Sequence, residues 1–382
     1  MPVKKYILNP IAELAEAGKL TGLMLIIATA FSLLLSNSDY GASYIKLWEN
    51  EIGFSFLHKS ILHWINDGLM PLFFLLVGIE IKREFTKGEL SDLRQAVLPV
   101  GAAIGGILVP AAIFVMFNFR NTENMSGWAI PTATDIAFSL GVLSLLGNRV
   151  PFALKVFLVA LAIIDDLGAI VIIAVFYSHD MNMMMMILAL AVFMVLLIFS
   201  RFRVKSSLLY IGGGGLLWFF ILKSGIHPTI AGVLVALIVP RELAEEMEHS
   251  LTRPVSYFIL PLFALANTAI PLSFQLGEGL FSALSIGIIA GLFLGKPLGV
   301  IGMSMILKRL KLAELPAGVS WKHIIGVGFI AGIGFTMSIF IASLSFEESG
   351  PASVAKLAII IGSLVAAITG TIIIRLCPKE KL

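Results

Sequence analysis

Long apolar runs separated by short polar or turn segments make up most of this chain, and they constrain its fold more than any other feature. A helix that crosses a bilayer needs about 20 mostly apolar residues, and twelve runs approach that length. These runs are residues 15–35, 61–81, 95–118, 127–146, 151–177, 182–200, 206–222, 225–240, 255–273, 280–307, 322–346 and 352–376. The sequence predicts an all-α integral membrane protein with twelve transmembrane helices, or eleven if the short seventh and eighth runs are one span.

The shortage of charge supports the same fold class. Asp, Glu, Lys and Arg make up 13% of the chain, against roughly 25% in a soluble domain. So few charges could not cover the surface of a soluble protein of this size, which excludes a cytosolic enzyme, a disordered chain and a nucleic-acid binder. No GxxxxGK[ST] phosphate loop is present, so we expect neither an ATP-driven pump nor a cofactor. The single cysteine, Cys377, cannot form an internal disulfide.

Basic residues are distributed very unevenly between the two sides of the predicted spans. Counting loops in order, 21 Lys and Arg fall on the side of the termini and 5 on the other side, and Lys296 lies inside a span. Cytoplasmic loops carry such an excess of positive charge. The sequence therefore predicts a multi-pass membrane protein with both termini in the cytoplasm and an even number of spans.

The only sizeable external segment is residues 40–60. Its stretch from Tyr44 to Phe56 carries β-prone aromatic residues around Asn50 and Glu51, which predicts a short external β-hairpin. Two strands alone are marginally stable, so the hairpin would need a partner, for which a second copy of the chain is a candidate. A plain loop is the alternative.

Four ionisable residues lie within a turn of the midpoint of their predicted spans. Asp165 and Asp166 lie in the fifth span, Asp135 in the fourth and Lys296 in the tenth. A charge at this depth costs about 2.5–3.5 kcal/mol on insertion scales. Charges kept at such a cost indicate a functional site for ions or protons.

Neighbouring residues of a helix point about 100° apart, so Asp165 and Asp166 can have different surroundings. One can face a water-filled pathway while the other meets Lys296, the only mid-span cation. Carboxylate oxygens suit hard cations such as Na⁺ or Li⁺, and they also bind protons, so the two compete for one site. The alternatives are a purely structural Asp–Lys pair and interhelical hydrogen bonding by both aspartates.

Two predicted spans contain residues that interrupt a helix. Pro131 precedes Thr132, Ala133 and Thr134 in the fourth span, and four glycines occur between 326 and 334 in the eleventh. Unwound backbone at membrane depth is tolerated only where protein or a water-filled cavity surrounds it. The two are the middle spans of the triplets 95–177 and 280–376, a pattern typical of transporters with inverted repeats. Close packing of helices through glycine is the alternative.

At this point the sequence resembles the NhaA-type Na⁺/H⁺ antiporters of bacteria over essentially the whole chain. The resemblance rests on an ordered set of motifs: VGIEIKRE (78–85), PTATDIAFSLGVL (131–143), LAIIDDLGAIVIIA (161–174), GIHPTIAG (225–232), ILPLFALANTAIPL (259–272), GLFLGKPLG (291–299) and GIGFTMSIFIA (332–342). NhaA is itself one of the proteins on which the inverted-repeat rule is based.

The resemblance implies one transmembrane transporter domain over 1–382. Its core bundle would be 95–177 and 280–376, with crossed, discontinuous fourth and eleventh helices, and its interface bundle would be 15–81 and 225–273, linked by 182–222. The family's activity is electrogenic, pH-regulated exchange of cytoplasmic Na⁺ or Li⁺ for external H⁺ by alternating access. A homodimer in the lipid membrane, joined partly by the hairpin, is also implied.

The resemblance also assigns roles to residues. It implies Asp166 as the main cation ligand and Asp165 as a proton carrier paired with Lys296, and it places Thr134 and Asp135 at the helix crossing. The residues alone leave open whether both aspartates or Lys296 release the protons. The implied pH-responsive residues are Glu80, Arg83, Glu84, His227, Glu248 and His249. A histidine that some members carry shortly after the His249 position is Thr252 here.

Three other function classes also occur among membrane-spanning proteins. A membrane enzyme is not expected, because adjacent aspartates diverge and no GxGD motif is present. A proton-coupled carrier of a small organic solute is the main alternative, although no mid-span Arg is present to recognise a solute. A channel would not need buried titratable groups opposed by a lysine.

Overall fold

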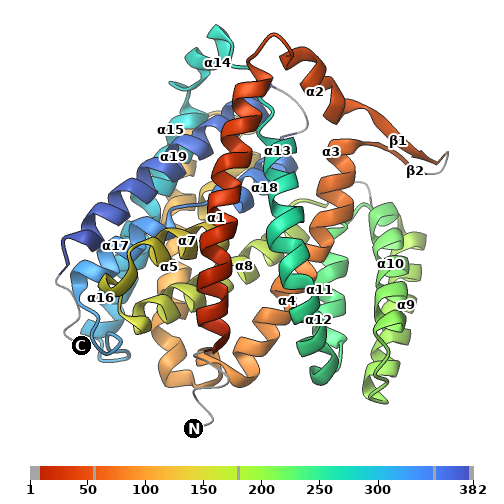
Figure 1. Ribbon diagram of the computed structural model, residues 1–382, viewed down its shortest axis with the longest axis horizontal. Coiled ribbons are helices and arrows are strands. Elements are labelled where there is room, and N and C mark those ends of the chain that lie inside the picture. The colour runs from red at the N-terminus through yellow and green to blue at the C-terminus, as the bar shows by residue number, and fades with distance from the viewer. Residues whose placement is uncertain (1–8, 55–56, 179–180, 347–349, 378–382) are drawn as a thin grey trace.

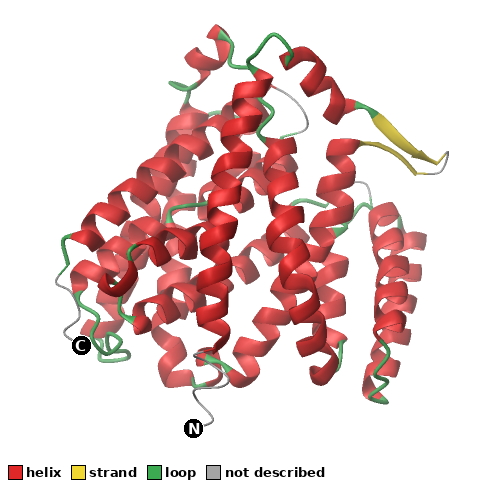
Figure 2. Cartoon of the chain, viewed as in Figure 1, coloured by secondary structure: helices red, strands yellow, loops and turns green. Residues whose placement is uncertain are grey.

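Apolar helices long enough to cross a membrane dominate the computed structural model, which describes residues 9–54, 57–178, 181–346 and 350–377 (Figures 1 and 2). Eight helical segments meet the length and apolarity of a span, and two further helix pairs would each be one bent span. The chain is therefore an all-α membrane protein with eight to ten such spans in the part that the structure describes.

The order of the elements along the chain follows the predicted runs. It is α1 (Asn9–Ser36), α2 (Gly41–Glu49), β1 (Glu51–Phe54), β2 (Leu57–Ser60), α3 (Ile61–Trp64), η2 (Ile65–Leu69), α4 (Met70–Lys87), η3 (Glu89–Ser91), α5 (Leu93–Asn118), α6 (Thr122–Met125), η4 (Ser126–Thr132), α7 (Ile136–Leu145), η5 (Gly147–Arg149), α8 (Phe152–Phe176), α9 (Met183–Arg201), α10 (Ser207–Ser224), α11 (Thr229–Ile238), α12 (Arg241–Pro254), η6 (Val255–Ile259), α13 (Leu260–Asn267), α14 (Phe274–Gly279), α15 (Ala283–Ala290), η7 (Gly291–Gly295), α16 (Lys296–Arg309), α17 (Trp321–Ala331), α18 (Phe335–Ser345) and α19 (Gly350–Arg375).

Two of the twelve predicted runs lack a helix that meets the criteria for a span. The run 225–240 contains α11, which has only ten residues. The run 255–273 continues the amphipathic helix α12 through η6 into α13. The seventh and eighth runs are separate helices, because Gly225 ends α10 with a left-handed φ of 85° that glycine adopts without strain.

The external hairpin exists, but the prediction of its position was wrong. Residues from Tyr44 to Glu49 belong to helix α2, and the hairpin is formed by β1 and β2. The antiparallel register pairs Glu51 with Ser60 and Phe54 with Leu57, so Glu51 lies within a strand and Asn50 precedes it, and neither is in a turn between the strands. Trp48 and Tyr44 pack edge to face at 5.6 Å, four residues apart on α2, a spacing that suits a helix.

The two triplets of helices repeat one order of elements. Each has a long helix, then a bent pair, then a second long helix: α5, η4 with α7, and α8 in the first, and α15–α16, α17 with α18, and α19 in the second. Their first helices pack closely, since a Cβ on Gly299 would lie 2.0 Å from the carbonyl oxygen of Gly105. The glycines therefore allow direct backbone contact between α5 and α16.

The bundle has two ends, which we name by their landmarks. The hairpin side carries α2, the β-hairpin and α14, and the terminal side is the opposite end, where the N-terminus lies (Figure 1). Helix α4 follows β2 and runs from the hairpin side to the terminal side, while α13 and α18 run the other way. Ser36 at the end of α1 donates to the carbonyl of Ile270, which fixes the end of α13 at the hairpin side.

Three helices contain a π-helical turn that is followed by proline. The turns η2, η6 and η7 precede Pro71, Pro261 and Pro297 by two residues. Proline has no N–H, so the carbonyl four residues earlier loses its helical donor. At the first of these turns the carbonyl of Asp67 accepts a bond from Trp218 Nε1 at 2.6 Å instead. Such turns change the direction of nearby side chains and are frequent at functional sites.

A candidate cation site at the crossing of two broken helices

Two bent helix pairs cross in the middle of the bundle and complete each other's backbone. The bend is 44° between η4 and α7 and 41° between α17 and α18. At the break of the first pair, the N–H of Asp135 donates to the carbonyl of Ile333, in the break of the second pair, at 2.7 Å. The hydroxyl of Thr134 donates to the carbonyl of Ala331 at 2.7 Å. Unwound backbone is therefore satisfied within the protein, as membrane depth requires.

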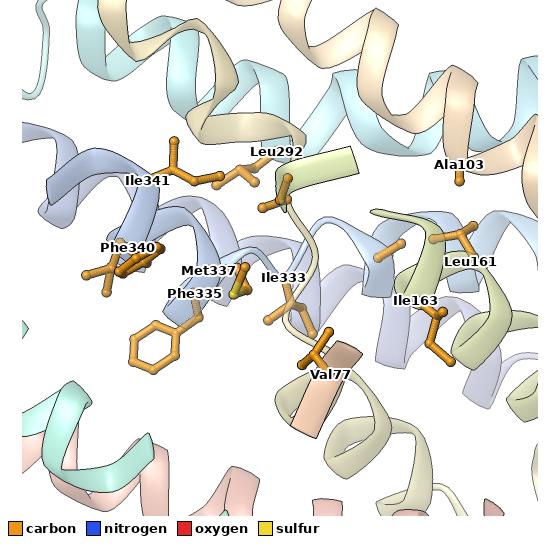
Figure 3. Close-up of a cluster of buried hydrophobic side chains, with 14 of the residues drawn as sticks. Val77, Ala103, Leu161, Ile163, Leu292, Ile333, Phe335, Met337, Phe340 and Ile341 are labelled. Atoms are coloured by element: carbon orange, nitrogen blue, oxygen red, sulfur yellow. The ribbon is translucent and has the colours of Figure 1, made fainter. Parts of the chain in front are cut away.

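An apolar shell surrounds this crossing (Figure 3). Leu292 of η7, Ile333 of the break and Met337 of α18 are at most 1% exposed. The shell leaves little room for water and lowers the local dielectric, so every charge inside it interacts more strongly than it would in water. The few polar groups that remain here therefore dominate the chemistry of the crossing.

Asp135 lies where two half-helices begin. Its Oδ1 accepts from the backbone N–H of Phe138 at 2.9 Å, in the first turn of α7. Its Oδ2 accepts from the backbone N–H of Thr336 at 3.0 Å, in the first turn of α18, and from the Thr336 hydroxyl. The N-terminal end of a helix carries a partial positive charge. The single carboxylate of Asp135 therefore offsets the partial positive charges of two helix N-termini.

Lys296 and Asp165 form a fully buried ion pair. Lys296 Nζ lies 2.6 Å from Asp165 Oδ2, and both side chains are inaccessible to solvent. The ammonium also donates to the carbonyl of Thr132 at 2.5 Å, at the C-terminal end of η4, where the partial charge is negative. Thr134 Oγ1, whose single proton is shared with the carbonyl of Ala331, also lies 2.7 Å from Asp165 Oδ2. Lys296 thus meets Asp165 through a bond that links α16 to α8.

Asp166 differs from its neighbour because it forms no ion pair with a basic side chain among the described residues. Its side chain is 2% exposed, and Oδ1 is enclosed without a hydrogen bond in the part of the chain that the structure describes. Asp165 Oδ1 is enclosed in the same way. A buried carboxylate oxygen left unpaired is costly. The two oxygens therefore suit a small hard cation or a proton as ligand.

A cavity of about 60 Å³ connects Asp166 to Glu80, nearer the terminal-side end of α4. Its other polar lining groups are Thr21, Asp135, Ser256 and Thr336. The volume holds only a few waters, so a small ion entering it must shed water and meet these oxygens. Sequence analysis did not single out Thr21 or Ser256, because a hydroxyl in an apolar run carries no signal that separates it from a packed core residue.

Four of the predicted pH-responsive residues lie together at the terminal side. Arg83 forms an ion pair with Glu248 of α12 and lies 3.4 Å from the Glu84 carboxylate, and Glu80 is buried one turn before Glu84 on α4. Burial raises the pKa of the Glu248 carboxyl above its ordinary value, although the positive charge of Arg83 opposes this shift. The pair is therefore sensitive to pH.

The two histidines of the predicted pH-responsive set are placed differently. His249 is exposed on α12. His227 lies at the hairpin side, with Nε2 3.5 Å from Asp67 Oδ1, and Asp67 in turn binds Lys59 of the hairpin at 2.5 Å. His227 therefore lies apart from the group at the terminal side. Asp67 and Lys59 were missed, although Asp67 is an ionisable residue inside an apolar run.

Comparisons with known proteins identify a family for this chain. The model of the family described as Na⁺/H⁺ antiporter 1 matches residues 12–374. The Na(+)/H(+) antiporter NhaA 2 of Flavobacterium johnsoniae is 48% identical over 370 residues, which cover 94% of this chain and 91% of the relative. The Na(+)/H(+) antiporter NhaA of Citrobacter koseri is 49% identical over 362 residues, covering 91% and 93%.

A solved structure shows the same fold. The sodium proton antiporter MjNhaP1 from Methanocaldococcus jannaschii, at pH 8, aligns with a TM-score of 0.53 at 15% identity, covering 98% of this chain and 99% of that one. The family model and the curated relatives cover nearly the whole chain, and the apolar helices make it a multi-pass membrane protein. The chain therefore belongs to the Na⁺/H⁺ antiporter 1 family.

Proposed function

We propose that this protein exchanges Na⁺ or Li⁺ for H⁺ across a membrane, and that it is a transporter without enzymatic activity. One observation carries the proposal: the buried carboxylate of Asp166 lines a narrow cavity, and one of its oxygens has no hydrogen-bond partner among the described residues. The proposal is supported by membership of the family and by the curated relatives, which are described as Na⁺/H⁺ antiporters.

Exchange follows from competition for the same oxygens. When a Na⁺ ion binds the carboxylates of Asp166 and Asp165, a proton on those oxygens must leave, and when protons return on the other side the ion must leave. Each cycle moves net charge if two protons replace one Na⁺. The second proton comes either from Asp165 or from Lys296, whose ammonium can give up its proton when the cation weakens its pair with Asp165.

Alternating access requires the site to face each side in turn. The proposed core bundle, 95–177 and 280–376, carries Thr134, Asp135, the two aspartates and Lys296. It would move against the proposed interface bundle, 15–81 and 225–273. The terminal side would face the cytoplasm of a bacterial cell, as the excess of basic residues there indicates. The hairpin would join two copies in a homodimer within the lipid membrane.

The size of the cavity argues against the organic-solute alternative. Sites for drug-sized organic ligands are about 300–1,000 Å³, whereas the cavity beside Asp166 has a volume of about 60 Å³. A partly dehydrated alkali ion fits such a space. The family assignment also disfavours an organic substrate.

The test is an ion-exchange measurement in membrane vesicles that contain the protein and an internal pH dye. Addition of Na⁺ or Li⁺ should collapse an imposed proton gradient, and K⁺, sugars and amino acids should not. Asp166→Asn should abolish the response. A gradient that collapses with an organic solute and not with Na⁺, or an Asp166→Asn protein that responds like the parent, would overturn the proposal.

A further inference from the structure

One face of α18 leads from the site towards the hairpin side. Thr336, Phe340 and Ser343 are spaced by four and three residues, so they lie in line along one helix face. Thr336 binds Asp135 at the crossing. The other two residues therefore lie further along α18 towards the hairpin side (Figure 1), where an ion that leaves the site on that side would have to pass.

Aromatic rings close this route immediately beyond the site. Phe340 is fully buried and is among the side chains drawn in Figure 3. Its ring centroid lies 5.4 Å from that of Phe74 on α4 and 6.2 Å from that of Phe263 on α13. His227 packs against the same ring at 5.3 Å. These distances are those of packed aromatic pairs, so an ion cannot pass without displacing Phe340.

Above this ring the side chain of Asn267 joins four helical segments. Asn267 Nδ2 donates to Asn66 Oδ1 of η2 at 2.9 Å and to its own helix at Phe263 O at 3.1 Å. Its Oδ1 lies 3.4 Å from Lys356 Nζ of α19 and 3.4 Å from Asn66 Nδ2. It also lies 3.2 Å from Ser343 Oγ of α18, whose single proton is shared with the carbonyl of Ile339 at 3.0 Å. Asn267 is 1% exposed. The amide thus ties η2 and α13 to α18 and α19.

An amide is the side chain that this position requires. Asparagine offers two N–H donors and an oxygen with two acceptor sites. A carboxylate could not donate to Asn66 and Phe263, and an apolar residue would leave the surrounding buried groups unpaired. The position lies in the ILPLFALANTAIPL motif of 259–272, to which the ion site gave no role.

We propose that Asn267 is a positioning residue of the exchange cycle. Its bonds to Asn66, Ser343 and Lys356 hold the hairpin-side route closed over Phe340. This closed arrangement belongs to the state in which the cavity reaches Asp166 from the terminal side. This inference rests on the proposed function and on the proposed bundles, because Asn66 and Asn267 belong to one bundle and Ser343 and Lys356 to the other. Movement of the bundles breaks these bonds and lets Phe340 swing away.

The change in apparent Na⁺ affinity should have opposite signs on the two sides of the membrane. A general loss of stability would not produce opposite signs. Bonds made only in the state open to the terminal side favour that state, so their loss shifts the population towards the opposite state. Apparent affinity for Na⁺ falls with the fraction of protein open to the side of addition. Loss of Asn267 therefore weakens apparent Na⁺ affinity at the terminal side and strengthens it at the hairpin side.

The experiment compares Asn267→Ala with the parent in everted and in right-side-out vesicles, which present opposite sides to added Na⁺. The half-saturating Na⁺ concentration should rise at the terminal side and fall at the hairpin side, and the ratio of the two concentrations should change by about threefold to tenfold in total, as expected for about one net buried hydrogen bond. Thr268→Val is the matched control. Thr268 is buried beside Asn267, but its hydroxyl bonds only the carbonyl of Ala264 in its own helix.

Equal changes on both sides, or no change, would overturn the inference. If Asn267→Ala does not insert or fold, Ser343→Ala removes a single donor to the same oxygen and should give smaller shifts of the same opposite signs. Failure of the parent to exchange Na⁺ for H⁺ refutes the proposed function, whereas a parent that exchanges and variants without opposite shifts refute this inference alone.

Discussion

Lys296 Nζ lies 2.6 Å from Asp165 Oδ2, with both side chains fully removed from solvent. Adjacent in sequence, Asp166 has no such partner and lines the cavity that reaches Glu80. Asp165 is held by its ion pair with Lys296, whereas Asp166 faces the cavity, so the two neighbouring carboxylates have different chemistry. We expect the first to set the stability of the crossing and the second to set cation affinity.

Breaking the buried pair from one side should destabilise the protein strongly. Lys296→Met leaves the Asp165 carboxylate buried without its counter-charge, which costs about 3–5 kcal/mol. The double variant Lys296→Met with Asp165→Asn removes both charges and should recover most of that loss. Thermal unfolding of the purified proteins in detergent checks this, and a double variant less stable than Lys296→Met would contradict it.

Asp135 should contribute through both its charge and its hydrogen bonds. Asp135→Ala removes the acceptors for the first turns of α7 and α18, and loss of a cap costs about 0.5–2 kcal/mol for each helix. Asp135→Asn keeps one acceptor oxygen and loses the charge and the second acceptor. Unfolding temperatures should therefore fall in the order parent, Asp135→Asn, Asp135→Ala. A reversal of the last two would show that the bonds to Phe138 and Thr336 matter little.

Glu248 should affect the pH dependence of transport. Because burial raises its pKa, acidification protonates it at a higher pH than an exposed glutamate, and protonation weakens its ion pair with Arg83. The neighbouring charges are Glu84 of α4 and Glu245 of α12. If the charged pair supports activity, transport falls as pH falls through this pKa.

The variant Glu248→Gln lacks the charged pair at every pH. Its activity at alkaline pH should drop towards the acidic level, which flattens the profile of exchange rate against pH. Glu246→Gln, on the same helix but exposed, is the control and should keep the parent profile. An unchanged profile in Glu248→Gln would remove this residue from the pH response.

Close packing of the two repeats should depend on Gly299. A Cβ at this position meets the backbone of Gly105, which cannot move away like a side chain. Gly299→Ala should therefore separate α5 from α16 and lower both the unfolding temperature and the yield of folded protein. Gly302→Ala, on the same helix with open space around its Cα, should be neutral or slightly stabilising because alanine favours helix. Equal behaviour of the two variants would contradict the packing argument.

The sequence was most informative at positions where a residue type costs free energy in a membrane helix. Asp135, Asp165, Asp166 and Lys296 stand out because ionisable groups are rare at membrane depth, and the structure brings all four to one crossing. Pro131 and the glycines between 326 and 334 mark the backbone breaks for a similar reason, since they weaken helices. The family resemblance added the roles that these residues play.

The sequence was least informative where contacts between distant segments determine the local structure or the neighbours of a residue. Tyr44 has high β-propensity, but such propensity depends strongly on context, and here its hydroxyl binds Ser32 of α1 at 3.1 Å while its helix α2 packs on the bundle. His227 could be placed at a span end but not beside Asp67, because depth in the membrane does not give lateral position. Asn267 resembled an ordinary polar residue, since its role depends on four segments that meet only in the fold.

The most direct test is calorimetry of Na⁺ binding to the purified protein, repeated in buffers that differ in ionisation enthalpy. If protons and Na⁺ compete for Asp165 and Asp166, binding should release protons, the observed heat should vary with the buffer, and affinity should weaken as pH falls. Asp166→Asn should show no binding. Na⁺ binding that releases no proton and keeps the same affinity at every pH would contradict the account.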